Sequence, residues 1–361
     1  MESKPRIIAT VINDVIYDQR MIRICASLTK KYDVELWGRV KSSEKTKSQL
    51  FTQRRFKFWM STGPLFYLEY NVFVFWALLF TKFDVLHAVD LDTLPAAFLA
   101  TKLKGKKLVY DSHEYFTEVP ELISRPAKRK VWLAIERFFL PKLTTAITVG
   151  SQIAQEYQAK YGVKFHVVRN CPIQKPMPLP IPGKPYLLYQ GALNKGRGLE
   201  ALVAAMPEID MHLKIAGSGD IEEELKAQAA DLGVLDKVSF LGMLDPADLP
   251  PLTVSAFAGI NVSENLGLSY YYSLNNKYFD YVHAGLPAIT NPFPEYMALE
   301  EKYPCSVYAT SASQEIVKAV NLLLNDKELY QKLKKNCLLA ARDLVWSNEE
   351  KTLLTVYEEI V

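Results

Sequence analysis

The sequence predicts an α/β protein with two domains, each built on a parallel β-sheet that helices cover on both faces. Short apolar strand patterns alternate with amphipathic helix patterns along the chain, beginning with a strand at 6–12 and a helix at 18–30. A chain of 361 residues is longer than one hydrophobic core usually supports. Five prolines before Gly183 interrupt the pattern, which restarts at Tyr186, so we expect a domain boundary there.

The elements of the first half follow the order expected of a parallel sheet, and the second half repeats it. Strands are predicted at 33–38, 54–59, 84–88, 107–111 and 145–149, and helices at 93–104, 127–140 and 151–161. A surface loop within one domain is the alternative to a linker, but chain length and the restarted strand pattern favour two domains. The predicted parts are an N-terminal domain at 1–170, a linker at 171–185, a C-terminal domain at 186–345 and a last helix at 346–361.

Composition and cysteine usage are typical of a globular protein from a reducing compartment. Hydrophobic residues make up 49% of the chain and charged residues 23%. The four cysteines have no CxxC spacing, so the sequence indicates neither a disulfide framework nor a zinc site. They are Cys25, Cys171, Cys305 and Cys337. The apolar run in the first twelve residues is too short for a signal peptide. We therefore expect a cytoplasmic protein.

Charge is divided unevenly between the two halves of the chain. Residues 1–180 hold 28 Lys and Arg against 16 Asp and Glu, about +12, whereas 181–361 hold 15 against 24, about −9. A basic half is typical of proteins that meet nucleic acid, an anionic membrane or an anionic substrate. The sequence contains no nucleic-acid-binding motif, so we expect no nucleic-acid partner and retain the anionic membrane surface.

The most apolar stretch, 65–80, is interrupted by Glu69 and Asn71 and is short for a membrane span. Two interpretations are open. The helix is either part of the first domain's core or rests one face in a membrane interface, helped by nearby basic residues. Those residues are Arg54, Arg55, Lys57 and Lys82.

The segment 263–291 contains the strongest candidate for an active site, because polar residues lie there between two predicted buried strands. The strand 257–262 precedes it, a helix is predicted at 277–284, and Gly285 closes that helix. We expect Asp280 in the first turn of the helix, above the carboxyl ends of the strands. A carboxylate held there suits the hydroxyl groups of a ribose.

Two glycine-containing loops follow predicted strands of the second half. The loop 190–200 (QGALNKGRGLE) contains Gly191 and Gly198, which allow the backbone to approach a ligand closely before a helix whose N-terminus favours anions. Gly217 in IAGSGD also fits a phosphate loop, although a tight turn capped by Asp220 is the favoured alternative. The first of these loops is therefore expected to meet a phosphate group.

Polar residues also follow two strands of the first domain, at the edge where open α/β sheets bind ligands. Asp90 and Asp92 form a DxD pattern that could hold a metal ion, but we favour Asp92 as a helix N-cap. His113 lies between Asp111 and Glu114 in DSHE. Asp111 and Glu114 are expected to orient the histidine ring or to line the acceptor side, where a second substrate would bind.

Four stretches, in this order, resemble one enzyme family. They are YQGALNKGRGLEALVAAM at 189–206, LKIAGSGD at 213–220, DYVHAGLPAIT at 280–290 and WSNEEKTLLTVYEEI from 346. The third aligns without a gap with the family segment EAMAxGxPVI. The chain thus resembles, over nearly its whole length, the retaining glycosyltransferases of family 4. The resemblance implies the GT-B architecture, in which two Rossmann-like domains face each other across a cleft and the last helix returns to the first domain.

The resemblance also implies roles for single residues. His113 matches a histidine that touches the donor sugar. Arg197 matches a lysine before glycine and would clamp the leaving diphosphate, with Lys195 or Lys277 supplying a second positive charge. Ala192 stands where many members have arginine.

The family's first glutamate lies eight residues before its second, but Tyr272 stands at that distance from Asp280. Because ENLGL resembles the family's EGFGL, we place the first role on Glu264. Gly242, in LGML, matches the place where the backbone cradles the base. Backbone N–H groups are expected to meet the sugar and phosphate at Asn265, Leu266, Gly267 and Leu268.

The function implied is hexosyl transfer, with retention at the anomeric carbon, from a nucleotide diphosphate sugar to an acceptor hydroxyl. A UDP-sugar is expected rather than a GDP-sugar, with no metal or other cofactor. The expected setting is cell-surface polysaccharide or glycolipid assembly, with a glycan or lipid-linked acceptor at the inner face of the membrane. A GT-B nucleotide-sugar epimerase and a catalytically silent nucleotide-binding scaffold are the alternatives.

Overall fold

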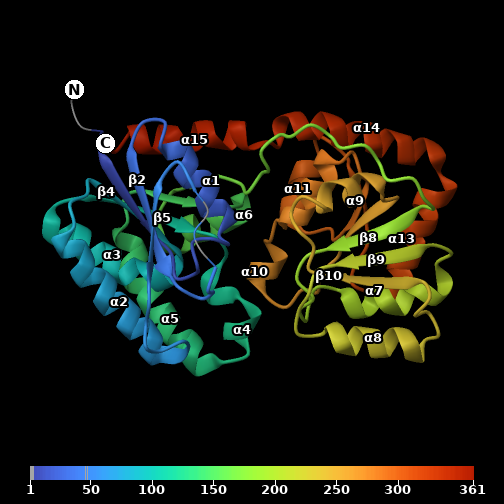
Figure 1. The fold of residues 1–361 in the computed structure, drawn as a ribbon, viewed down its shortest axis with the longest axis horizontal. Helices are drawn as coiled ribbons and strands as arrows, with labels where there is room; N and C mark the ends of the chain where they lie inside the picture. The colour runs from blue at the N-terminus through green and yellow to red at the C-terminus, as the bar shows by residue number, and fades with distance from the viewer. Residues whose placement is uncertain (1–3, 45, 47) are drawn as a thin grey trace. The chain divides into compact units, whose positions relative to one another are not determined.

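The computed structural model describes residues 4–44, 46 and 48–361. The chain divides into two compact units (Figure 1). Unit 1 comprises residues 1–170 and 347–361, and unit 2 comprises residues 171–346. Each unit contains one parallel sheet, which confirms the predicted α/β class.

The sheet of unit 1 has seven parallel strands. Their order is β3 (Thr52–Phe56), β2 (Asp33–Arg39), β1 (Arg6–Thr10), β4 (Val85–Val89), β5 (Lys107–Ser112), β6 (Ala146–Thr148) and β7 (Phe165–Val167). The chain order reverses between β1 and β4, so the loops after these two strands diverge. Ligands bind open α/β sheets at such a point.

Helices lie on both sides of this sheet (Figure 1). They are α1 (Gln19–Leu28), α2 (Gly63–Phe80), α3 (Asp90–Lys104), α4 (Pro120–Ile123), α5 (Pro126–Phe139), α6 (Ser151–Tyr161) and α15 (Trp346–Glu358). Rings of α2, α3 and α5 meet edge to face, which packs these three helices together. Helix α3 begins at Asp90, earlier than predicted, so the expectation that Asp92 is the N-cap was wrong.

Helix α15, at the end of the chain, packs within unit 1. Lys30, which follows α1, pairs with Glu350, and Arg169 pairs with the buried Glu349. The hydroxyl group of Tyr357 lies 2.6 Å from Nδ1 of His87, in β4. Because both of these side chains are fully buried, the contact ties the last helix into the core under the sheet.

Helix α2 packs one face into the core of unit 1, as the first of the two interpretations made from the sequence predicted. Four residues at helical spacing face the core: Phe66, Tyr70, Val74 and Leu78. Among the described residues it is the one helix whose length and apolar composition would allow it to cross a bilayer. However, the hydroxyl group of Tyr70 donates to the carbonyl of Val11, and Asn71 bonds to the backbone of α3. The helix is thus an integral part of unit 1.

The sheet of unit 2 has six parallel strands. Their order is β10 (Val238–Gly242), β9 (His212–Ala216), β8 (Tyr186–Gln190), β11 (Ala258–Asn261), β12 (Ala288–Thr290) and β13 (Ser306–Tyr308). Strand β8 is apolar except for Gln190 at its end, as is typical of a strand that is covered on both faces. Leu187 and Tyr189 point into one helix layer, whereas Tyr186 and Leu188 point into the other. The chain order reverses between β8 and β11.

Two helix layers complete unit 2. One contains α7 (Leu199–Ala205), α8 (Glu222–Asp231) and α13 (Ser313–Asn325). The other contains α9 (Leu249–Ser255), α11 (Asn276–His283), α12 (Pro294–Glu300) and α14 (Lys327–Asp343). The short helix α10 (Leu268–Tyr271) precedes α11.

Candidate functional site

Unit 2 contains a cavity of about 390 Å³ that opens beside the carboxyl ends of β8 and β9. This is the edge at which its chain order reverses and where ligands are expected. The predicted residues that line it are Gly191, Arg197, Gly217, Lys277 and Asp280. The other lining residues are Tyr189, Gln190, Ala192, Ala216, Ser218, Met243, Leu244, Leu249, Asn275 and Asn276.

Glycine is required where the loops that border this cavity meet. The N–H of Gly217 donates to Gly242, at the end of the neighbouring strand, and its φ is +145°. A Cβ atom at position 217 would lie 1.9 Å from the carbonyl oxygen of Gly191, which has a φ of +136°. Any larger residue would therefore force the loops after β8 and β9 apart.

Two cations line the cavity. Lys277 is 9% exposed, and its Nζ lies 3.6 Å from the centre of the Tyr189 ring. Arg197 donates to Asn275 and lies over the ring of Tyr270. Burial, and then the charge of Arg197, hold the pKa of Lys277 well below its usual range.

Neither cation forms an ion pair within the described part of the chain. Arg197 and a protonated Lys277 in the same cavity would repel each other, and their charges are costly to bury. An anion placed between them would remove that cost. The cavity is therefore suited to a multiply charged anion such as a diphosphate.

Asp280 lies on the same wall of the cavity, but not in the turn predicted for it. Helix α11 begins at Asn276 and has no acidic residue in its first turn, so Asp280 is in the second. Its Oδ2 accepts a hydrogen bond of 2.9 Å from the side chain of Gln190, at the end of β8. That bond holds an exposed carboxylate at the rim of the cavity.

Several predicted donor-site residues do not line the cavity. Lys195 is exposed on the loop before Arg197. The N–H of Glu264 donates to Gly196, which joins their two loops. The N–H of Leu266 donates to Glu264, so it is not available to a ligand as predicted. The remaining predicted residues outside the lining are Gly198, Gly242, Asn265, Gly267 and Leu268.

Sequence reasoning missed Gln190 and Asn275, which hold Asp280 and Arg197 respectively. Gln190 could have been found, because it is a polar residue at the last position of an otherwise apolar strand, YLLYQ. Asn275 carries no comparable signal. It lies in the loop before α11, and only the folded chain brings it to Arg197.

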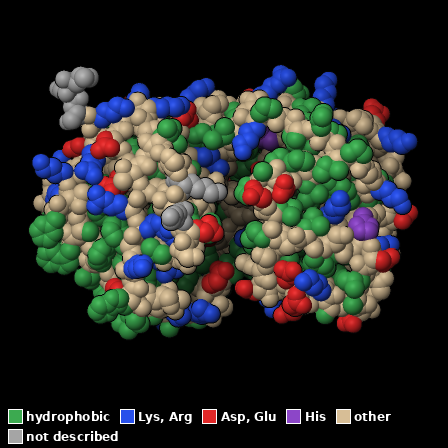
Figure 2. Space-filling model, in the orientation of Figure 1, with side chains coloured by type: hydrophobic (Ala, Val, Ile, Leu, Met, Phe, Trp, Pro, Cys, Tyr) green, Lys and Arg blue, Asp and Glu red, His purple; other side chains and the backbone are tan. Residues whose placement is uncertain are grey.

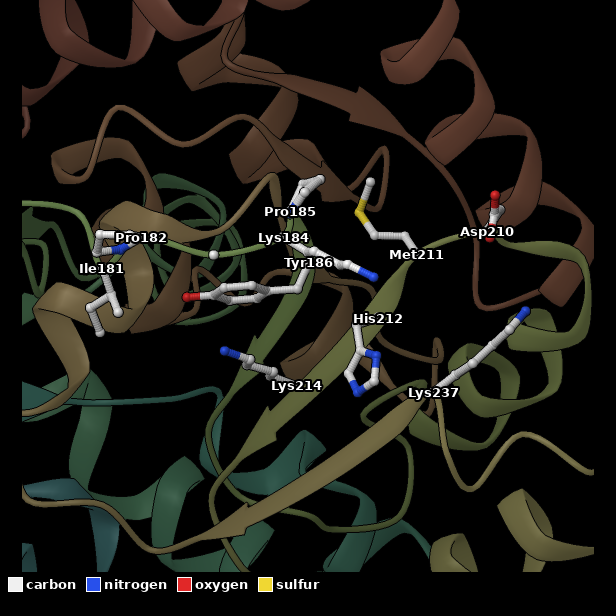
Figure 3. A pocket seen from close by; sticks show the side chains of 11 residues that line it. Ile181, Pro182, Lys184, Pro185, Tyr186, Asp210, Met211, His212, Lys214 and Lys237 are labelled. Carbon is white, nitrogen blue, oxygen red and sulfur yellow. The ribbon is translucent and has the colours of Figure 1, made fainter.

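A second cavity of unit 2, of about 440 Å³, lies at the opposite edge of the sheet. Figure 3 shows its side chains, among them Tyr186, His212 and Lys237 at the amino ends of three strands. The ammonium group of Lys214 lies 3.8 Å from the centre of the Tyr186 ring. Because ligands of parallel sheets bind at the carboxyl edge, this cavity is not the candidate donor site.

Unit 1 places His113 in a network of charged groups at the carboxyl ends of β4 and β5. Asp111 is completely buried and accepts two hydrogen bonds from Arg20. Its Oδ2 lies 3.1 Å from Nε2 of His113 and 3.4 Å from Nε2 of His87. A buried Asp111 cannot line an acceptor surface, so it serves to orient the histidine ring.

Asp90 supports the same ring from the end of β4. Its Oδ1 accepts the backbone N–H of His113 at 2.8 Å. It is also the one non-glycine residue with positive φ, +56°, in the part of the chain that the structure describes. Such strained residues concentrate at functional sites. Glu114, which was predicted to orient the ring of His113 or to line the acceptor side, is exposed.

These carboxylates determine the charge of His113. Burial opposes protonation, but the charges of Asp111 and Asp90 outweigh it and raise the pKa of His113 to about 9. Burial raises the pKa of Asp90 to about 6. His113 is thus a cation at neutral pH, when Asp111, whose pKa is well below its usual range, is ionised.

We predict that the ring of His113 titrates near pH 9 rather than at its usual 6.5. Because the folded-state pKa is raised, protonation of His113 stabilises the fold fully below about pH 6.5, and this contribution is lost as the pH rises through 9. NMR titration of the five histidines measures the value, and His113→Gln assigns the signal. A His113 pKa at or below 6.5 would contradict the network.

The DxD pattern does not form a recognisable metal site. Burial, and then the charge of Asp90, hold the pKa of Asp92 well above its usual range. Among residues 4–44, 46 and 48–361, no group of three or more His, Cys, Asp or Glu side chains is arranged to hold a metal ion. Asp90 instead contacts His113.

Comparison with known families accounts for both units. Residues 19–171 match the model described as Glycosyltransferase Family 4, and residues 174–338 match the model described as Glycosyl transferases group 1. The two matches adjoin at the boundary between the units.

Solved structures share the fold over almost the whole chain. Sucrose-phosphate synthase from Thermosynechococcus elongatus superposes with a TM-score of 0.81 at 17% identity, covering 99% of both chains. Anabaena HepE, in complex with UDP, gives 0.75 at 15% identity, covering 99% of this chain and 100% of that one. WaaG, a glycosyltransferase involved in lipopolysaccharide biosynthesis, gives 0.73 at 15%, covering 97% and 99%.

Curated relatives match over short segments. An uncharacterized glycosyltransferase, MJ1607 of Methanocaldococcus jannaschii, is 40% identical over 74 residues, which is 19% of either chain. D-rhamnosyltransferase WbpZ of Pseudomonas aeruginosa is 37% identical over 76 residues, 21% of this chain and 20% of that protein. Each match spans about a fifth of the relative. With adjoining family models over both units and the shared architecture, this chain belongs to the family 4-like glycosyltransferases of the GT-B fold.

Proposed function

We propose that this protein transfers a hexosyl group from a nucleotide diphosphate sugar to an acceptor hydroxyl, with retention at the anomeric carbon. The observation that carries the proposal is the pairing of Arg197 with the buried Lys277 in one cavity of unit 2, where neither side chain forms an ion pair with a described residue. Asp280 at the rim adds an acceptor for hydroxyl groups. Together these groups suit the phosphates and the ribose of one nucleotide.

The chemistry required of this site is stabilisation of charge. As the glycosidic bond breaks, negative charge gathers on the departing diphosphate, and cations already in place stabilise it without reorganising. In the proposed mechanism the diphosphate also takes the proton of the acceptor hydroxyl, which then attacks the sugar from the same face. His113, held by Asp111 and Asp90, is proposed to contact the donor sugar.

The proposed donor is a UDP-sugar. Support comes from HepE, whose solved complexes contain UDP, UDP-glucose, and UDP with glucose. The proposed setting is cell-surface polysaccharide or glycolipid assembly at the cytoplasmic face of a membrane. WaaG, which is involved in lipopolysaccharide biosynthesis, is consistent with that setting.

The two alternatives have less support. Positive charge in the cavity suits nucleotide binding by an enzyme and by a silent scaffold alike, but both units match models of glycosyltransferase families, which favours the enzyme. A nucleotide-sugar epimerase is not indicated by either family model.

The test is to incubate the full chain with a panel of nucleotide sugars, with and without candidate acceptors, and to measure released nucleoside diphosphate. We expect release with one donor class and NMR coupling constants that show a product with the donor's anomeric configuration. Inversion would contradict retention. Tight nucleotide binding without release, even with acceptors present, would favour the silent scaffold.

A further inference from the structure

Helix α2 exposes an apolar stripe opposite the side that it buries. Its exposed residues recur at helical spacing: Leu65, Leu68, Val72, Trp76 and Phe80. Trp76 is 55% exposed and Phe80 is 85% exposed, and their rings stack on each other. Large aromatic side chains are rarely left in water without a partner.

The two helices beside α2 continue this surface. Leu99 and Leu103, one turn apart on α3, are 47% and 69% exposed. Val131 and Phe138, two turns apart on α5, are 61% and 57% exposed. Tyr67 of α2 meets Trp132 of α5, and Phe98 of α3 meets Phe139 of α5, so the three helices form one layer. In Figure 2, hydrophobic side chains gather over the region of α2 and its neighbours.

Basic residues lie along and beside the same three helices. Each is exposed and has no ion-pair partner in the described part of the chain: Lys82, Lys102, Lys128, Lys130, Arg137 and Lys142. The one acidic residue of α5, Glu136, is buried and bonded to Thr117, Lys160 and Tyr161. Helix α5 therefore presents only positive charge to solvent.

Two of the four basic residues selected from the sequence contribute less than predicted. Arg55 pairs with the buried Asp14, and Arg54 pairs with the buried Glu35. Their charges are neutralised within the fold. The positive charge next to the apolar stripe comes instead from α5 and from the ends of α2 and α3.

We propose that unit 1 docks on an anionic lipid bilayer through this three-helix surface, with the stripe of α2 lying in the membrane interface. An exposed Trp–Phe pair suits the boundary between headgroups and acyl chains, and unpaired Lys and Arg beside it suit anionic headgroups. A protein partner would need to match both features. Because Tyr70 and Asn71 tie α2 into the fold, the helix lies on the membrane rather than crossing it.

The proposal is tested with the full-length protein and vesicles of phosphatidylcholine, alone or mixed with phosphatidylglycerol, by co-sedimentation at low and high salt. We expect binding to the anionic vesicles at low salt, release at high salt and little binding to neutral vesicles. The triple variant Lys128→Gln, Lys130→Gln, Arg137→Gln is expected to reduce the partition coefficient roughly tenfold or more.

A matched control removes three exposed lysines from α14 of unit 2: Lys332→Gln, Lys334→Gln, Lys335→Gln. This control should bind as the wild type does. Trp76→Ser with Phe80→Ser should also lose binding, with Leu322→Ser on α13 as its control. No vesicle binding, equal binding to neutral and anionic vesicles, or equal losses in the α5 and α14 variants would each overturn the proposal. Because vesicle binding needs no sugar donor, this result is independent of catalysis.

Discussion

Arg197→Ala is expected to lower turnover of the best nucleotide sugar roughly ten- to a hundredfold and to leave the melting temperature almost unchanged. The guanidinium group lines the cavity, donates a hydrogen bond to Asn275 and lies over the face of Tyr270. Removing it therefore costs little packing. A charge-assisted hydrogen bond to the departing diphosphate, worth roughly 1.5 to 3 kcal/mol, would be lost.

Lys195→Ala is the matched control, since this exposed residue lies two positions earlier in the same loop but outside the cavity lining. Steady-state turnover and thermal melting of both variants separate a clamp from a general loss of positive charge. Normal turnover by Arg197→Ala together with impaired turnover by Lys195→Ala would show that Arg197 does not bind the leaving diphosphate.

Asp280→Asn is expected to weaken binding of the nucleoside diphosphate by roughly 1 to 3 kcal/mol. The carboxylate lies at the cavity rim, where one oxygen accepts from Gln190. An ionised carboxylate can accept from both ribose hydroxyls, whereas an amide of the same shape offers a single acceptor oxygen. The structural role left to Asp280 is small, because it lies in the second turn of α11 and is exposed.

Titration calorimetry with the ribonucleotide and its 2′,3′-dideoxy analogue distinguishes ribose binding from a helix-stabilising role. The wild type should prefer the ribonucleotide, and Asp280→Asn should lose most of that preference. An unchanged preference in the variant would exclude Asp280 as the ribose ligand.

The alternation of apolar strands and helices was sufficient to predict two parallel α/β units, because strands buried on both faces form distinct apolar runs. Strand β8 (YLLYQ) is an example. Helix starts were harder to predict. Asp92 looked like a cap because polar residues favour that position, yet α3 begins two residues earlier at Asp90.

Parts of the candidate donor site were predictable, because some of its positions accept few residue types. Gly217 has no room for a side chain, and a lysine next to a predicted helix start, such as Lys277, is conspicuous in the sequence. Tertiary partners were not predictable. Gln190 is 90 positions from Asp280, and Asn275 is 78 positions from Arg197.

The three-helix surface that we propose docks on a bilayer illustrates the same limit. Net charge correctly marked the N-terminal half as basic, but charge counts cannot distinguish a free cation from a paired one. Arg54 and Arg55 find Glu35 and Asp14 only after β2 and β3 are placed side by side.

The most direct test of the nucleotide-binding cavity is calorimetry of the nucleoside diphosphate in mildly alkaline buffers of different ionisation enthalpy. The pKa of Lys277 is lowered by burial and by Arg197, and a bound diphosphate would raise it, so binding should take up protons at Lys277. We predict one site, a heat that depends on the buffer, and loss of both proton uptake and most affinity in Lys277→Met. The opposite result would be that wild type and Lys277→Met bind the nucleoside diphosphate with the same affinity, with a heat that does not depend on the buffer. It would contradict the assignment of this cavity, and of Lys277 in it, to the diphosphate.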